Sequence, residues 1–461
     1  MQLVSIRLIR ERWMAPLAYA LMLVAAVMAF LLIAQAGESL TATVASIDAP
    51  PRHATPTPHV NPLTHVLLVL IAVVTLGRLL SKLFARFQQP PVIGEVLAGI
   101  ALGPSLLGRF WPAATEFLLP TAIAGYLNVL AQLGVILYMF VVGLELNGGL
   151  LRRRAHATVA ISHASILAPF LLGALLALWL YPRLAVRGAD FTSFALFIGV
   201  AMSVTAFPVL ARILSDRGMT KTELGVVALG CAASDDVTAW CLLALVVGVA
   251  EAKVGGAFWI IAGALAYLAV MFLVVRPIAE RLSRRHDRPL TPGVMALVFV
   301  AVLASALCTE WIGIHAIFGA FVLGAIIPHD SPLATELTYK LEDFVTVLLL
   351  PAFFAFTGMR TRLDLVSGTN AWLICGLVLL VATIGKFGGT LTAARLAGQS
   401  WRDSAALGVL MNTRGLMELV VLNIGLDLGV ISPTLFAMMV IMAVVTTMAT
   451  TPLLTLLVRR Y

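Results

Sequence analysis

Two neighbouring aspartates in an apolar stretch are the residues best placed to do chemistry. Asp235 and Asp236, preceded by Ser234, lie near the middle of a hydrophobic run over residues 222–250. Ionisable side chains inside a membrane are costly and usually functional. Neighbours on a helix point about 100° apart, so the two carboxylates cannot share one site symmetrically. We expect one to pair with a basic group while the other faces a water-filled cavity, where it binds a proton or a cation.

A lysine in another apolar run is the expected basic partner. Lys386 lies deep inside the run over 371–395, too far from either end for its ammonium to reach water easily. An unpaired ammonium there would lose its proton or find a carboxylate. Either Asp235 or Asp236 fits that role. A purely structural salt bridge is the alternative interpretation.

Two further runs carry features that interrupt a helix at mid-span. In the run over 190–213, Pro208 follows Thr205, and proline removes a backbone hydrogen bond. The freed carbonyls and the Thr205 hydroxyl are candidates to line a cation site, although a simple proline kink is the alternative. In the run over 402–426, Arg414 and Glu418 form a polar cluster at the centre. Discontinuous backbone at membrane depth is tolerated where it lines a protein cavity.

The two interrupted runs occupy matching places in the chain. The first directly precedes the aspartate pair, and the second directly follows the Lys386 run. Matching interruptions in two halves indicate a transporter built from repeats, with a site near the membrane midplane. Opposing half-helix ends leave partial charges there. We expect the aspartates, Lys386, Arg414 and Glu418 to compensate these charges.

The composition requires many membrane spans to carry these residues. Of 461 residues, 61% are hydrophobic and 12% are charged, whereas soluble proteins are about 25% charged. Continuous apolar runs of about 20 residues predict spanning helices and argue against a transmembrane barrel. We therefore predict an all-α membrane protein with about fourteen transmembrane helices. The spans cover roughly 14–35, 62–84, 91–108, 126–146, 156–180, 190–213, 222–250, 256–275, 292–309, 313–328, 341–359, 371–395, 402–426 and 432–458.

The distribution of basic residues sets the expected orientation. The net charge of +8 would suit nucleic-acid binding, but Lys and Arg cluster in short loops between apolar runs, as in membrane proteins. Most of these loops fall on one side, including arginines at 152–154 and 459–460. Both termini are then cytoplasmic, in a bacterial inner membrane. We interpret residues 1–61 as an extra helix, favoured over a cleaved signal peptide, and an external linker over 37–61.

At these residues the sequence resembles the monovalent cation:proton antiporter-2 family, within the cation:proton antiporter superfamily. The resemblance covers about residues 62–461 and is carried by several motifs in order. These are QPPVIGEVLAGI (89–100), LGP (102–104), FVVGLEL (140–146), TAFPVLAR (205–212), the aspartate pair, KFGGT (386–390) and NTRGLMEL (412–419). The last motif is similar to the plant cation/proton exchanger branch and its bacterial relatives.

The resemblance implies a fold with an inverted repeat and two crossed, interrupted helices. It implies core helices over about 126–250 and 371–458, which move like an elevator against dimerisation or scaffold helices over about 62–108 and 256–359. It also implies a homodimer. Asp236 matches the essential cation- and proton-binding carboxylate, and Asp235 matches the partner of Lys386. Thr205 and Arg414 match the unwound parts of the two crossing helices.

The expected function is secondary active antiport of a monovalent cation, Na+ or K+, against protons. Asp236, Asp235, Thr205 and Ser234 are the expected cation and proton ligands, and no cofactor is expected. A gated cation channel or an efflux system of the same fold is the alternative. An intramembrane aspartyl protease is disfavoured because its two aspartates must converge from different helices. We therefore do not expect an enzyme.

Overall fold

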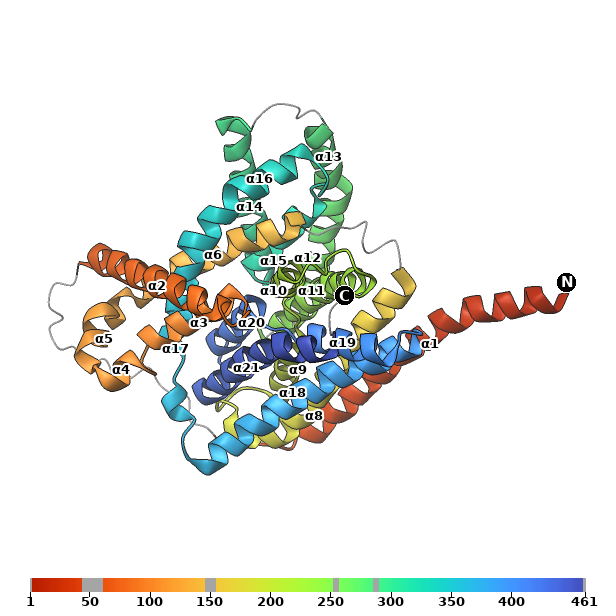
Figure 1. Cartoon of the computed structure of the whole chain (residues 1–461), viewed down its shortest axis with the longest axis horizontal. Helices are drawn as coiled ribbons and strands as arrows, with labels where there is room; N and C mark the ends of the chain where they lie inside the picture. Colours follow the sequence, from red (N-terminus) through yellow and green to blue (C-terminus); the bar gives the residue numbers. More distant parts are fainter. Residues whose placement is uncertain (1, 44–60, 146–154, 252–256, 285–289, 459–461) are drawn as a thin grey trace.

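The computed structural model describes residues 2–43, 61–145, 155–251, 257–284 and 290–458. Within these ranges the chain forms helices, and one isolated bridge joins Ala185 and Ile431. Most of the predicted linker over 37–61 lies outside the described residues, as do the arginines at 152–154 and 459–460. The chain is an all-helical, multi-pass membrane protein, as the sequence predicts (Figure 1).

Twelve helices of the described chain are long and apolar enough to cross a membrane, or thirteen when one bent pair counts as a span. A shorter apolar helix, α15 (Ala316–Ile326), lies beside them. Its 11 residues fall below the roughly 20 that a spanning helix needs. The predicted number of about fourteen is therefore an approximation.

One group of helices, here the central group, repeats the same arrangement twice. A long helix is followed by an interrupted pair and then by another long helix. The first set is α8 (Ala155–Leu184), α9 (Phe191–Ser203), α10 (Phe207–Asp216) and α11 (Glu223–Glu251). The second set is α18 (Gly368–Leu396), α19 (Trp401–Met411), α20 (Leu416–Asp427) and α21 (Pro433–Leu457). The two interrupted helices expected from the sequence are confirmed, and the helix order repeats. The inverted orientation of the two sets stays a prediction.

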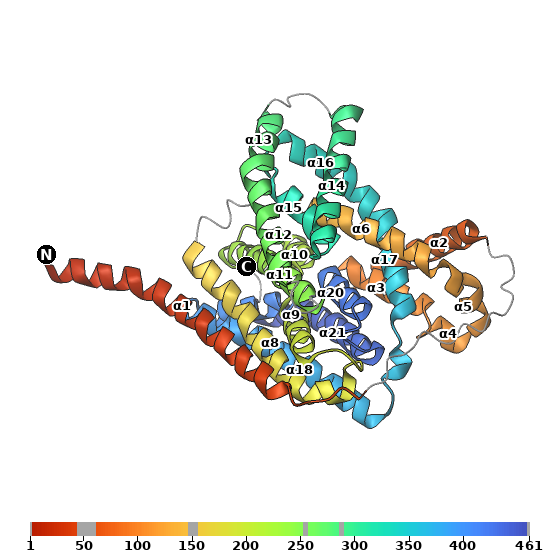
Figure 2. The ribbon, with the colours of Figure 1, turned by 180° about the vertical axis from the view of Figure 1, so that it is seen from behind.

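The remaining helices surround the central group (Figures 1 and 2). The flanking group consists of α2 (Pro62–Ala85), α3 (Pro91–Leu102), α6 (Ala124–Glu145), α14 (Pro292–Ile312), α15, α16 (Pro332–Phe344) and α17 (Leu350–Arg360). Short helices α4 (Leu107–Phe110) and α5 (Pro112–Leu118) join α3 to α6, and α12 (Ala257–Val270) and α13 (Arg276–Arg284) follow α11. The helix α6 packs mainly against α15 and α17.

Short polar residues start the central helices. Asp190, Ser400 and Ser432 precede α9, α19 and α21, and each side chain accepts a hydrogen bond from a backbone N–H three residues on. Such caps satisfy donors that have no partner within the helix. The caps therefore fix where these three helices begin.

The long helices α8 and α18 pack closely because small residues meet between them. A Cβ atom added to Gly385 would lie 2.7 Å from Pro169 Cα, and one added to Gly389 would lie 2.6 Å from Ala168 Cβ. Glycines let helix backbones approach closely in membranes. This close approach brings Lys386, which lies between the two glycines, against α8.

The helix α1 (Gln2–Gly37) packs on α8 and α9. Tyr19 meets His163 edge to face, with ring centroids 5.4 Å apart, and Phe30 lies 5.6 Å from Phe170. The additional N-terminal helix thus contacts the central group and covers part of α8 (Figure 2).

Candidate ion-binding site

The breaks in the two interrupted helices meet and are joined by a backbone hydrogen bond. The N–H of Ala206, just before α10, donates to the carbonyl of Thr413, just after α19, at 3.0 Å. The Thr205 hydroxyl lies 2.9 Å from Asp235 Oδ2 and 3.0 Å from the Met411 carbonyl. Because a hydroxyl has one proton, it donates to one of them at a time. The breaks are thereby held together at the site of the buried charges.

Two cations saturate the C-terminal end of the half-helix α9. Arg414 donates from Nη1 to the Ala201 carbonyl at 2.8 Å and from Nη2 to the Met202 carbonyl at 2.6 Å. Lys386 Nζ donates to the Ser203 carbonyl at 2.6 Å. The last carbonyls of a helix lack partners within it and carry partial negative charge. Lys386 and Arg414 supply both the hydrogen bonds and the compensating charge.

Asp235 is surrounded by hydrogen-bond donors. Its Oδ1 accepts from Ser162 at 2.6 Å, and its Oδ2 accepts from Ser165 at 2.8 Å. Lys386 Nζ also donates to Oδ2, at 2.8 Å, and the side chains of this ion pair are 0% exposed. Hydrogen bonds that join a charged donor or acceptor are stronger than those between neutral groups. Asp235 and Lys386 therefore form a buried and mutually neutralised pair.

Asp236 has a different environment one residue further on. It is 2% exposed, and neither carboxylate oxygen has a hydrogen-bond partner among the described residues. The backbone N–H of Phe207, the first residue of α10, approaches the carboxylate without hydrogen-bonding geometry. A buried carboxylate is costly unless it carries a proton or meets a cation. Asp236 is thus able to bind either one.

The second break contains another buried pair. Arg414 Nη1 lies 3.2 Å from Glu418 Oε2, and both side chains are 0% exposed. The backbone N–H of Arg414 donates to Thr447 Oγ1 at 2.8 Å, and the Thr447 hydroxyl donates back to the Arg414 carbonyl at 2.7 Å. These contacts tie the break to α21. Arg414 and Glu418 neutralise each other, as Asp235 and Lys386 do.

The residues singled out in the sequence mostly gather at this crossing. Thr205, Lys386 and Asp235 are in direct contact, and Lys386 bonds to Asp235 rather than to Asp236. Ser234 is buried on α11, but among the described residues its hydroxyl contacts neither aspartate. Which of these residues bind the transported ions stays a prediction.

Sequence reasoning missed Ser162 and Ser165, which supply two of the donors to Asp235. Both lie on α8, three residues apart, on one helical face. The signal that could have identified them was their spacing within an apolar run, which lets both hydroxyls contact the same polar group. Serine is common in membrane helices, so the spacing alone carried little information.

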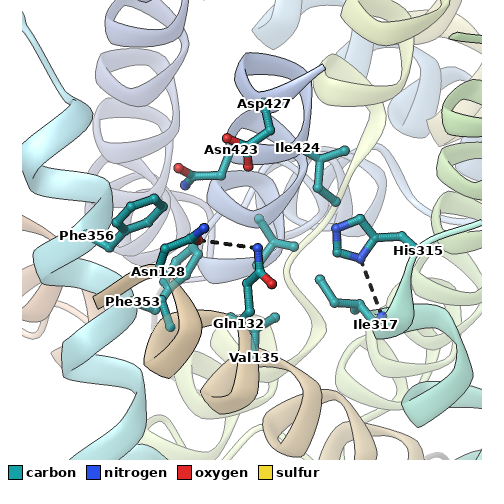
Figure 3. A pocket seen from close by; sticks show the side chains of 12 residues that line it. Asn128, Gln132, Val135, His315, Ile317, Phe353, Phe356, Asn423, Ile424 and Asp427 are labelled. Atoms are coloured by element: carbon teal, nitrogen blue, oxygen red, sulfur yellow. Dashed lines mark hydrogen bonds between the residues drawn. The ribbon is translucent and has the colours of Figure 1, made fainter. Parts of the chain in front are cut away.

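A polar hollow lies where the central and flanking groups meet, near the end of α20 (Figure 3). It has an empty volume of about 350 Å³ and lies between α6, α15, α17 and α20. Asn128 and Gln132 of α6 face Asn423 and Asp427 of α20 across it. His315, which caps α15 through a contact of Nδ1 with the Ile317 N–H, forms another wall. The motifs found in the sequence did not indicate this hollow.

Crossed half-helices with a buried carboxylate beside them are the architecture of a secondary transporter. The family model described as sodium/hydrogen exchanger, transmembrane, matches residues 68–460. The chain therefore belongs to the sodium/hydrogen exchanger family. This membership agrees with the resemblance found in the sequence motifs.

Named relatives extend this result. A Na+/H+ antiporter, NhaS4, of Synechocystis sp. is 47% identical over 397 residues, which cover 85% of this chain and 97% of that protein. Cation/H+ antiporter 17 of Arabidopsis thaliana is 40% identical, covering 85% of this chain and 49% of that protein. K+/H+ antiporter 1 of Saccharomyces cerevisiae is 35% identical, covering 85% and 46%. The chain spans about half the length of these plant and yeast relatives.

A solved structure shares the fold. The sodium proton antiporter MjNhaP1 from Methanocaldococcus jannaschii superposes with a TM-score of 0.55 at 17% identity, covering 85% of this chain and 96% of that one. At this identity the likeness concerns the arrangement of helices alone.

Proposed function

We propose that this protein exchanges a monovalent cation, Na+ or K+, for protons across the membrane, with Asp236 as the shared binding group. The relatives named above are a Na+/H+ antiporter, a cation/H+ antiporter and a K+/H+ antiporter. Antiport is common to all three names, whereas the cation differs. The names therefore support exchange and leave both cations as substrates to be compared.

One observation carries this proposal. At the crossing, Asp235 is paired with Lys386 and Glu418 with Arg414, whereas both Asp236 oxygens have no partner among the described residues. Charge balance in the buried site then needs one positive charge at Asp236. A proton or a monovalent cation supplies that charge equally well. Competition between the two for a single carboxylate is the basis of exchange.

The mechanism we propose is alternating access by an elevator-like shift. The central group would move against the flanking group only when Asp236 carries a proton or a cation, because a bare charge cannot cross the apolar barrier cheaply. The division into moving and stationary helices largely follows the expectation from the sequence. It differs at α6, which we assign to the stationary side because it packs mainly against α15 and α17.

The boundary between the two groups suits such a shift because, among the residues that the structure describes, few polar contacts cross it. Near the end of α20, Arg360 of α17 bonds to Asp427 at 2.7 Å and to Asn423 Oδ1 at 3.3 Å. Asn423 also donates to Thr357 Oγ1 at 3.0 Å. We call these four residues the outer clasp. In the expected orientation they hold the external side closed.

A group of glutamates near Tyr138 supports access to Asp236 from the cytoplasmic side in this state. The phenol of Tyr138, on α6, lies within electrostatic reach of Asp236 and of Glu95, Glu145 and Glu342. Glu95 and Glu145 lie near helix ends that the charge distribution places in the cytoplasm. Glu342 lies further along its span, at the end of α16. Acidic groups around a cleft raise the local concentration of cations. A cation attracted there would reach Asp236 past Tyr138.

We further propose a homodimer in a bacterial inner membrane, with both termini in the cytoplasm. The basic loops support this orientation. Exposed apolar side chains on the outward faces of the flanking group, such as Leu303 and Trp311 of α14, suit contact with lipid or with a second copy. The resemblance to antiporters favours a second copy on that side.

Reconstitution in liposomes tests the exchange directly. With an imposed pH gradient reported by a fluorescent dye, adding Na+, K+ or Li+ outside should release protons. Asp236→Asn should abolish the release because the neutral amide cannot carry the exchanged proton and has no charge to balance a cation. Asp216→Asn is the matched control, since Asp216 forms an exposed pair with Arg212. Cation-driven proton release that persists in Asp236→Asn would refute the assignment.

The same vesicles discriminate between exchange and a channel. An exchanger moves cations only when protons or cations are present on the opposite side, so rubidium-86 uptake should depend on an internal counter-ion. A channel would pass rubidium down its gradient without one. Uptake that is independent of the internal ions would replace the antiporter proposal with the channel alternative.

A further inference from the structure

Two serines on α8 hold the ion pair beside the proposed binding site. Ser162 donates to Asp235 Oδ1 at 2.6 Å, and Ser165 donates to Oδ2 at 2.8 Å. Both side chains are 0% exposed. Because these are hydrogen bonds to a charged acceptor, they are stronger than bonds between neutral groups. The serines therefore fix the carboxylate of Asp235 on the α8 side of the crossing.

Ser165 also contacts the ammonium group directly. Lys386 Nζ lies 2.8 Å from Asp235 Oδ2, 2.6 Å from the Ser203 carbonyl and 3.3 Å from Ser165 Oγ. An ammonium has three N–H donors, and these three acceptors match them. The Ser165 hydroxyl accepts from Lys386 while it donates to Asp235. Lys386 consequently has no free donor to turn toward Asp236.

The carboxylate of Asp236, one residue along α11 from Asp235, is a competitor for that ammonium because it has no hydrogen-bond partner among the described residues. Its charge acts on Lys386. If Lys386 lost one acceptor, its freed N–H would find an acceptor at Asp236. The ammonium would then occupy the place that a transported cation needs.

We propose that Ser162 and Ser165 are positioning residues that keep Lys386 on Asp235 and so leave Asp236 open to the transported cation. This inference rests on the proposed function, since it assigns Asp236 as the cation ligand. Ser165 has the larger part because it contacts both members of the pair, whereas Ser162 contacts Asp235 alone. The close packing at Gly385 and Gly389 brings α18 near enough to α8 for these contacts.

The inference predicts a specific change in cation affinity. In proteoliposomes of the full chain, Ser165→Ala should raise the KM for the activating cation about tenfold, the worth of one hydrogen bond to a charged group. Ser162→Ala should raise it about threefold, since it removes a contact with Asp235 but none with Lys386. In both variants, kcat should fall by less than KM rises, because the site becomes blocked rather than distorted.

Two matched variants separate positioning from packing. Ser404→Ala removes a hydroxyl that is equally buried on α19 and has no hydrogen-bond partner in the described chain, and it should leave KM unchanged. Ser165→Thr keeps the hydroxyl and should retain a KM near that of the wild type. Melting temperatures measured in detergent confirm that each variant is folded before its kinetics are compared.

The outcomes distinguish this inference from the proposed function. A Ser165→Ala variant with unchanged KM, or with a loss of kcat alone, would overturn the positioning role while leaving exchange at Asp236 intact. Wild-type protein without cation-driven proton release would overturn both. A raised KM in Ser165→Ala, with normal values in Ser165→Thr and Ser404→Ala, would establish it.

Discussion

Two of the chain's ion pairs have nearly equal lengths but lie in contrasting surroundings. Lys386 and Asp235 lie 2.8 Å apart with both side chains fully buried, whereas Arg360 and Asp427 lie 2.7 Å apart with side chains 20% and 49% exposed. Breaking a buried pair leaves an uncompensated charge and is strongly destabilising. An exposed pair contributes little because water and salt replace its partner. Similar distances therefore correspond to very different energies.

The difference fits the parts of the molecule in which the pairs lie. The buried pair connects α18 to α11 within the central group, together with α8 and the break before α10. The partly exposed pair crosses between the central and flanking groups, where the proposed elevator-like shift would require contacts to open and re-form. A strong bond there would lock one state. The pair that is costly to break therefore lies within the central group, and the weaker pair lies between the central and flanking groups.

The largest expected effect comes from breaking the buried pair. Lys386→Met should lower the free energy of unfolding by about 3–5 kcal/mol, because Asp235 is left charged and buried. The measurement is thermal or denaturant unfolding in detergent. Lys340→Met, which removes a partly exposed pair with Glu336, is the control with little effect. Adding Asp235→Asn to Lys386→Met should recover most of the loss, and a further loss instead would contradict the account.

A smaller effect should follow from replacing Arg414, at the second break, with a side chain of the same charge but a different shape. Arg414→Lys leaves a cation beside Glu418 but cannot reach the Ala201 and Met202 carbonyls together. One carbonyl left without a donor, and a poorer pair with Glu418, should cost about 2–4 kcal/mol. The unfolding assay measures this. If Arg414→Lys is as stable as the wild type, charge alone accounts for the role of Arg414.

The contact between α8 and α18 offers a further test within the central group. Gly385→Ala places a Cβ atom 2.7 Å from Pro169 Cα, and such overpacking should cost about 1–3 kcal/mol. Gly388→Ala on the same helix meets nothing within 4 Å and should be neutral or stabilising, because alanine favours helices. Comparing the two melting temperatures checks the prediction. Equal effects would show that the helices can separate at little cost.

The smallest expected effect is at the outer clasp. Arg360→Ala should change the free energy of unfolding by less than about 1 kcal/mol, because water reaches this partly exposed pair and screens it. Its transport rate should rise modestly, because the state closed by the clasp is less favoured. High salt should have the same effect on the wild type by screening the pair. A large loss of stability would show that the clasp belongs to a rigid interface.

Much of the fold could be predicted from hydrophobic runs and helix breakers. Pro208 and the polar residues around Arg414 marked both interruptions, and the breaks lie at Val204–Ala206 and Asn412–Gly415. The boundaries were less certain where a helix is amphipathic. The predicted span over 341–359 begins too late because Pro332–Phe344 contains Glu336, Lys340 and other charged residues. That helix continues through the π-helical segment Val345–Leu349 into α17.

The site could be predicted as a set of residues, but its pairing could not. Both aspartates were possible partners for Lys386, and only the rotation of α11 against α8 and α18 decides that Asp235 receives the ammonium. Ser162 and Ser165 were missed for a related reason. Serine hydroxyls in helices often bond to a carbonyl four residues back, so sequence does not reveal which ones turn outward to another helix.

The hydrogen bond between Ala206 and Thr413 involves backbone atoms alone. Side-chain replacement at either position leaves its donor and acceptor in place, except for proline at 206. This backbone contact is therefore independent of which side chains stand at 206 and 413, unlike the buried ion pairs beside it. The contact that joins the two breaks can therefore be kept while the residues at these two positions vary.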